Sequence, residues 1–143
     1  MESLYTAHVT SRGGREGFVR SSDGRLNLKL SAPNGDAAEG PTNPEQLFAA
    51  GYGACFHSAV KAVAKSRKLS AEDSEVTANV TLMKGEQEGY RLSVRLDVYI
   101  PGLSEEQTRE VADKAHETCP YSKATRGDID VEVRAVAHQT TQS

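Results

Sequence analysis

The sequence predicts a single α+β domain over residues 1–143, in which antiparallel strands pack against two helices. Three observations support this class. Apolar and polar residues alternate in several segments that are separated by turn residues. Two other segments repeat apolar residues at helical spacing, and helix-capping residues precede each of them. The length of 143 residues suits one domain with a buried core.

Short strands are expected within the first thirty residues. The first lies over residues 5–10, the second at Phe18 and Val19 after a glycine-rich turn, and the third over residues 26–30. Residues 31–42 are rich in turn formers and contain no large apolar side chain. We interpret them as a loop within the domain.

A long helix is predicted to begin after this loop. Asn43 suits the N-cap, Pro44 suits the first helical position, and Gln46 completes a capping box. The apolar face consists of Phe48, Tyr52, Cys55, Ala59 and Val63. Residues 47–60 are apolar on nearly all sides, which one sheet cannot cover. We therefore expect a second subunit to pack against this helix.

A hairpin, a second helix and a final strand complete the predicted fold. The hairpin covers residues 76–100 and turns at 84–89. Ser104 and Gln107 form a capping box for the second helix, whose inner face ends at Cys119. Because Pro120 disfavours helical geometry at the preceding residue, Cys119 should lie at a helix boundary. Alternation over residues 129–135 predicts the last strand.

Charge and composition exclude several classes of function. The net charge is −3, and lysines and arginines are scattered rather than gathered on a basic face, so nucleic acid is not an expected partner. No segment approaches the roughly 20 apolar residues of a membrane span. The first residues lack the apolar core of a signal peptide. We expect a cytoplasmic protein.

The two cysteines, Cys55 and Cys119, allow two interpretations. Free cysteines are often small core residues, and their number alone favours that role. The alternative is transient redox chemistry, because ordinary cytosolic thiols stay reduced. A reactive thiol must ionise, but burial on an apolar helix raises its pKa, and the helix dipole fades after the first turn. A reactive Cys55 would therefore need a cation from elsewhere.

Arg15, in a glycine-rich turn, is the candidate cation, and Glu45 could hold it in bidentate geometry. Ordinary solvated roles are the alternative for both. About 15 Å of continuous helix would separate Glu45 from Cys55. They could share a site if the helix breaks near Gly51 and Gly53, if Glu45 reaches Cys55 of a partner subunit, or if the arginine spans part of the gap. The spacing leaves these possibilities open.

Metal binding is a weaker hypothesis. Cys55 and His57 are two residues apart, so a helix points them to different sides. Together with His116 and Cys119 they fit no common zinc spacing. We expect no metal and no cofactor, and we place both histidines on polar faces or at an interface.

Three segments resemble a known family: Gly-Gly-Arg-Glu-Gly at 13–17, Asn-Pro-Glu-Gln-Leu-Phe-Ala-Ala-Gly-Tyr-Gly-Ala-Cys-Phe at 43–56, and Cys-Pro-Tyr-Ser-Lys-Ala-Thr-Arg-Gly at 119–127. They resemble the organic hydroperoxide resistance (Ohr) branch of the OsmC/Ohr family, over nearly the whole chain. The long middle motif and Cys-Pro-Tyr-Ser are the specific ones, and the latter favours Ohr over its OsmC relatives.

The resemblance implies an intertwined homodimer, with antiparallel sheets wrapped around two central helices. It also implies that Cys55 is the peroxidatic cysteine, Cys119 the resolving cysteine, and Arg15 with Glu45 the activating pair. The expected function is reduction of organic hydroperoxides through a Cys55 sulfenic acid and a Cys55–Cys119 disulfide, in defence against oxidative stress. A dithiol, in this family a lipoylated protein, would reduce the disulfide.

Apolar groups near the thiol would favour alkyl or lipid hydroperoxides. We assign this pocket to Phe48, Tyr52, Phe56 and Tyr121. Three other functions remain open. They are an OsmC-type, osmotically inducible peroxidase, a non-catalytic dimeric carrier of a hydrophobic ligand, and a redox sensor.

Overall fold

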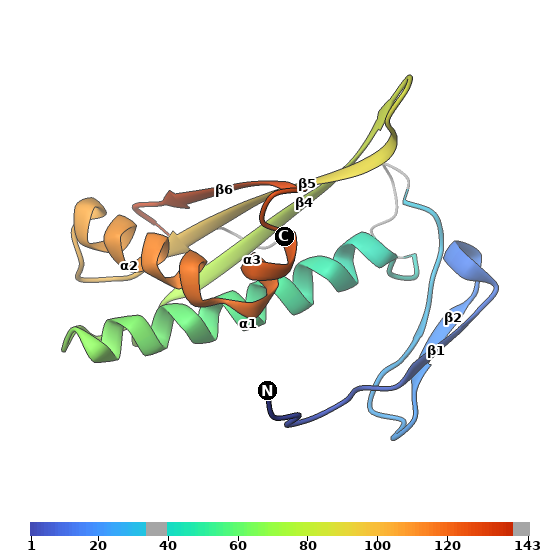
Figure 1. The fold of residues 1–143 in the computed structure, drawn as a ribbon, viewed down its shortest axis with the longest axis horizontal. Coiled ribbons are helices and arrows are strands. Elements are labelled where there is room, and N and C mark those ends of the chain that lie inside the picture. The colour runs from blue at the N-terminus through green and yellow to red at the C-terminus, as the bar shows by residue number, and fades with distance from the viewer. Residues whose placement is uncertain (34–39, 139–143) are drawn as a thin grey trace. The chain divides into compact units, whose positions relative to one another are not determined.

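The computed structural model describes residues 1–33 and 40–138. The chain folds as two compact units, Met1–Leu47 and Phe48–Ser143 (Figure 1). Residues 34–39 of the predicted loop lie outside the described residues. Next to them, Leu30 and Thr42 form an isolated parallel bridge. Among the described residues, no helix combines the length and apolarity that a membrane crossing needs.

The first unit contains a three-stranded antiparallel sheet in the order β1-β2-β3. Its strands are β1 (Val9–Arg12), β2 (Phe18–Ser21) and β3 (Asn27–Lys29). The prediction of a strand from residue 5 was wrong, because β1 begins at Val9. The pairing explains this limit, since Val9 faces Ser21 and β2 ends there. Beyond this pair the Ser22 amide still donates to the His8 carbonyl, but residues 1–8 do not form a strand.

Helix α1 (Pro44–Ser66) begins where the sequence predicts. The Asn43 side chain accepts a hydrogen bond from the Gln46 amide at 2.9 Å, as an N-cap does. The Gln46 side chain accepts from the Thr42 hydroxyl instead of returning to the Asn43 amide. The predicted capping box is thus only half formed.

The second unit contains a three-stranded sheet in the order β4-β5-β6. Its strands are β4 (Glu75–Gly85), β5 (Gly89–Tyr99) and β6 (Asp130–Ala135). The β4–β5 hairpin confirms the prediction. The prediction of a purely antiparallel arrangement was wrong, because β6 runs parallel to β5. The connection between them passes through two helices, which returns the chain to the end of the sheet where β5 began.

These two helices are α2 (Glu105–Thr118) and α3 (Pro120–Thr125). The predicted capping box of α2 is complete, with Ser104 and Gln107 bonded reciprocally. Cys119 has extended backbone geometry (φ −64°, ψ 125°) and separates the two helices, as Pro120 predicts. α3 was not predicted from the sequence, although proline also suits the first position of a new helix.

The core of the second unit lies where α1 and α2 pack on the apolar face of the sheet (Figure 1). The fully buried large side chains include Tyr52, Phe56 and Val60 from α1, Leu96 and Val98 from β5, and Val111 from α2. Cys119 is also fully buried, whereas Cys55 is partly buried against this core. The core therefore orients both thiols from different elements.

Replacing Ser104 tests the contribution of the cap to stability. Ser104→Ala should lower the free energy of unfolding by about 1 kcal/mol, because the Gln107 amide loses its acceptor. Urea denaturation measures this change. Ser3→Ala, at an exposed position outside the helices and strands, is the control and should have no effect. Equal stability of Ser104→Ala and the control would contradict the role of the cap.

Candidate active site

A glycine-rich turn between β1 and β2 presents Arg15. Gly13 and Gly14 have φ values of 81° and 61°, in the left-handed region that glycine tolerates best. A Cβ at position 17 would lie 1.7 Å from the Arg12 carbonyl oxygen, so only glycine fits there. Arg15 and Glu16 form a short 3₁₀ turn with Gly14. The glycines thus impose a tight backbone path on the segment that carries the arginine.

Arg15 and Glu45 form the bidentate pair that the sequence analysis considered. The two guanidinium nitrogens donate to the two carboxylate oxygens at 2.7 and 2.9 Å. The Glu45 side chain is 13% exposed and that of Arg15 is 46% exposed. The hydrogen bonds from Arg15 hold the pKa of Glu45 below its usual value and outweigh the opposing effect of burial. Glu45 is therefore ionised at neutral pH, and its carboxylate binds one edge of the guanidinium.

Cys55 and Cys119 also meet. Cys55 lies in the middle of α1 and Cys119 between α2 and α3, and their sulfur atoms are 3.8 Å apart. Both are free thiols in the structure. A disulfide needs about 2.05 Å between sulfurs, so a shift of less than 2 Å would form the bond. The folded chain therefore places two residues that are 64 positions apart in a suitable arrangement for thiol–disulfide chemistry.

Cys55 is a poor nucleophile in the environment that its own unit provides. Burial raises the pKa of the Cys55 thiol, and the neighbouring Cys119 raises it further. A backbone hydrogen bond from Tyr121 acts in the opposite direction but is outweighed. At neutral pH this thiol is protonated unless a cation approaches it. The requirement derived from the sequence thus holds for the second unit.

Helix α1 settles one of the open possibilities. It is continuous from Pro44 to Ser66, so no break occurs at Gly51 or Gly53. About 15 Å of helix axis separates Glu45 from Cys55. The Arg15–Glu45 pair belongs to the first unit and the two cysteines belong to the second. Approach by an arginine that spans the gap and approach from a partner subunit both remain possible.

The four predicted pocket residues differ in exposure. Tyr52 and Phe56 are fully buried, Phe48 is partly buried, and Tyr121 is 43% exposed. The Tyr52 ring contacts those of Phe48 and Tyr121, with centroids 6.1 and 5.8 Å away. Tyr121 also lies over Gly51, where an added Cβ would approach its hydroxyl to 3.2 Å. Of the four, Phe48 and Tyr121 are the ones that solvent can reach.

Both histidines make hydrogen bonds that the sequence analysis did not predict. His57 Nε2 lies 2.8 Å from the Ser74 hydroxyl, and His116 Nδ1 lies 2.7 Å from the Ser122 hydroxyl. Ser122 is fully buried and also bonds Tyr52. A serine in a turn-like segment gives no sequence signal that it will bond two distant side chains. The one clue was that Tyr52 lies on the same face of the predicted helix as Cys55. Within residues 1–33 and 40–138, no three metal-ligating side chains converge.

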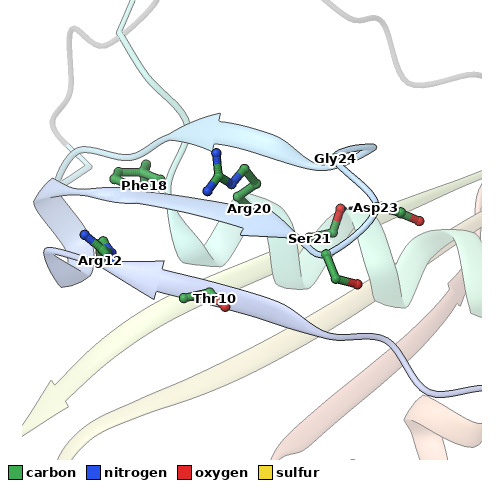
Figure 2. A pocket seen from close by; sticks show the side chains of 8 residues that line it. Thr10, Arg12, Phe18, Arg20, Ser21, Asp23 and Gly24 are labelled. Atoms are coloured by element: carbon green, nitrogen blue, oxygen red, sulfur yellow. Dashed lines mark hydrogen bonds between the residues drawn. The ribbon is translucent and has the colours of Figure 1, made fainter.

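A hollow of about 640 Å³ in the first unit has no thiol in its lining. It lies on the sheet face that carries Thr10, Arg12, Phe18 and Arg20, beside the turn at Asp23 and Gly24 (Figure 2). Figure 2 shows these side chains spread along the strands instead of pointing to one centre. The thiol pair is therefore the better candidate for chemistry.

Comparison with known proteins agrees with this geometry. A family model described as OsmC-like protein matches residues 34–134, which contain Glu45 and both cysteines. The organic hydroperoxide resistance protein OhrA of Bacillus subtilis is 51% identical over 134 residues, which cover 91% of this chain and 94% of that protein.

The chain belongs to the OsmC/Ohr family. Within it, the chain groups with the Ohr proteins. The organic hydroperoxide resistance protein of Xanthomonas axonopodis pv. citri is 50% identical over 131 residues, covering 90% of this chain and 92% of that protein. The crystal structure of OhrB of Bacillus subtilis superposes with a TM-score of 0.86 at 48% identity, covering 94% of this chain and all of that one. The α+β fold of this Ohr chain is therefore that of the family.

The distance between the sulfurs predicts an intrachain disulfide. Treating the reduced protein with the thiol oxidant diamide should convert both thiols of each chain into a Cys55–Cys119 bond, because the sulfurs are 3.8 Å apart. Peptide mass mapping without reductant identifies the crosslinked pair. Cys119→Ser is the control and should show no such crosslink. A disulfide between chains as the main product would contradict the prediction.

Proposed function

We propose that the chain is a thiol-dependent peroxidase that reduces organic hydroperoxides to alcohols. The observation that carries the proposal is the contact between the sulfurs of Cys55 and Cys119 at 3.8 Å. It occurs in a chain whose relatives at 47–51% identity are named organic hydroperoxide resistance proteins. Detoxification of such peroxides under oxidative stress would be its role.

The reaction would proceed in two steps on the two sulfurs. The Cys55 thiolate attacks the terminal peroxide oxygen, the O–O bond breaks, and the alkoxide leaves as an alcohol after taking up a proton. Cys55 becomes a sulfenic acid. The Cys119 thiol then attacks this sulfur, so that a disulfide forms and water is expelled. An external dithiol restores both thiols.

Arg15, oriented by Glu45, would supply the positive charge that Cys55 lacks. The bidentate pair keeps the guanidinium in a fixed orientation, and a cation within about 4–6 Å stabilises a thiolate. The same guanidinium could polarise the bound peroxide. The arginine would come from the same chain or from its partner.

The aromatic residues support a preference for organic substrates. Phe48 and Tyr121 present apolar surface that solvent can reach, and Tyr52 packs between their rings. Phe56 backs this cluster from inside the core. An alkyl or lipid tail would gain hydrophobic contact there that hydrogen peroxide cannot gain.

An intertwined homodimer, with sheets wrapped around two central helices, is part of the proposal. Two observations support it. Val9 and Leu28, on the apolar face of the β1-β2-β3 sheet, are 49% and 36% exposed. Helix α1 exposes the small residues Ala50 and Ala54, which would allow another backbone to approach closely. A second copy would cover these surfaces.

The setting of the reaction completes the proposal. The protein would act in the cytoplasm as a single OsmC/Ohr-like domain, without a cofactor, a nucleic acid or a membrane. Its reductant would be a dithiol on a lipoylated protein. Because Cys55 is only partly buried and Cys119 is buried, such a dithiol would approach the disulfide from the side of Cys55.

Removing Arg15 tests the electrostatic part of the mechanism. In a Cys119→Ser background, Arg15→Ala should raise the pKa of the Cys55 thiol and slow its alkylation by iodoacetamide about tenfold at pH 7. The rates should converge at high pH, where both variants are ionised. Arg12→Ala, which removes a neighbouring arginine, is the control and should react normally. Identical pH profiles for the Arg15 variant and the control would refute the role of Arg15.

Substrate comparison separates the proposed function from its rivals. Cumene hydroperoxide should oxidise the thiols faster than hydrogen peroxide does, because its apolar group packs on the aromatic residues. Equal rates would favour an OsmC-type peroxidase. A non-catalytic carrier predicts that neither peroxide consumes the thiols.

Cys55→Ser should abolish turnover, whereas full activity in this variant would show that the nucleophile is misassigned.

A further inference from the structure

The position of Cys119 depends on a helix too short to hold itself in place. α3 has six residues, Pro120–Thr125, and begins directly after Cys119. Isolated helices of this length are unstable in water, so tertiary contacts must fix α3. The rigidity of these contacts therefore sets how accurately Cys119 is held against Cys55.

One hydroxyl connects α3 to both longer helices. The Ser122 hydroxyl lies 2.8 Å from that of Tyr52 on α1 and 2.7 Å from His116 Nδ1 on α2. Ser122 and Tyr52 are fully buried. Thr125 adds a second, longer contact with the Tyr52 hydroxyl at 3.3 Å. Three helices thus meet at Ser122, and Thr125 lies three residues after it on α3.

The network also lies close to both thiols in sequence. Tyr52 precedes Cys55 by three residues on α1, and His116 precedes Cys119 by three residues. Residues three apart on a helix are neighbours on its surface. Ser122 itself follows Cys119 by three. The connection therefore ties together the helical turns that carry the two sulfurs.

His116 joins this network as a neutral ring. Burial and the nearby charge of Arg126 lower the pKa of His116, with Asp113 acting in the opposite direction, so the ring is neutral at pH 7. In the tautomer with the proton on Nε2, Ser122 donates to Nδ1 and accepts from Tyr52; in the other tautomer, His116 Nδ1 donates to Ser122. Alanine at position 122 would remove the hydrogen bonds to His116 and to the fully buried Tyr52, and would leave Tyr52 its longer contact with Thr125. Loss of a bond to a buried hydroxyl is unfavourable.

We infer that Ser122, through Tyr52 and His116, is a positioning residue that holds Cys119 against Cys55 for disulfide formation. This inference rests on the proposed function. The first step, in which peroxide oxidises Cys55, does not involve Ser122. The second step does, because the sulfurs must close from 3.8 Å to a bond. Loss of the Ser122 contacts should therefore lengthen the life of the sulfenic acid, which a second peroxide can convert to sulfinic acid.

The test follows the two steps separately in Ser122→Ala. Stopped-flow measurement with one equivalent of cumene hydroperoxide should show an unchanged rate of peroxide consumption. The rate of disulfide formation should fall by about tenfold or more, since a displacement of about 1 Å of a reacting group can lower a rate by this much. With excess peroxide, mass spectrometry should find sulfinic acid at Cys55. Ser58→Ala, at an exposed position of α1, is the matched control and should behave as wild type.

Two further variants make the result specific. Tyr52→Phe removes only one hydroxyl and should slow the disulfide step in the same direction, which decides the matter if Ser122→Ala does not fold. His116→Asn keeps a polar atom close to the position of Nδ1 and should retain faster disulfide formation than His116→Leu. A normal disulfide rate in folded Ser122→Ala, or equal slowing of both steps, would overturn the inference. An unchanged rate of disulfide formation in Tyr52→Phe would also overturn it.

Diamide separates failure of this inference from failure of the proposed function. It drives Cys55–Cys119 bond formation without any peroxide. If wild type consumes no peroxide but crosslinks with diamide, the peroxidase proposal fails. Slower crosslinking in Ser122→Ala than in Ser58→Ala would still support the positioning role, and equal rates would refute it.

Discussion

The Cys55 sulfur lies in the middle of α1, in contact with Cys119 and partly removed from water. This position is suited to forming a disulfide, but it penalises the thiolate that must react first, because burial and the second thiol both raise the pKa of Cys55. The same packing that brings the sulfurs together thus creates the need for a positive charge. Any chemistry at this site depends on how that charge is supplied.

The first unit carries the guanidinium to which the proposed function assigns this task. Three glycines set the path of the turn that carries Arg15, and Glu45 holds the guanidinium by two hydrogen bonds. Both members of this pair stay ionised at physiological pH, because arginine does not lose its proton and the pKa of Glu45 is lowered. A lysine in the same turn could not make the bidentate contact.

Much of the fold could be predicted from the sequence because its signals are local. The capping residues of α1 and α2 and the alternation along β4 and β5 fix these elements through contacts with near neighbours. The parallel pairing of β6 and the end of β1 depend on distant partners, so local patterns could not predict them. The chemistry of Arg15 and Glu45 made their pairing one possibility beside ordinary solvated roles, and the family resemblance implied it. Ser122 was missed, because its role arises from three helices that only the folded chain brings together.

The most direct test of the account is the pH dependence of a single turnover. Reduced wild-type protein is mixed with one equivalent of cumene hydroperoxide, and peroxide and free thiols are followed from about pH 5 to about pH 10. The account predicts that each chain consumes one hydroperoxide and loses both thiols, with a thiolate inflection below the value of about 8.5 for an ordinary cysteine. No consumption, or an inflection above that value, would contradict it.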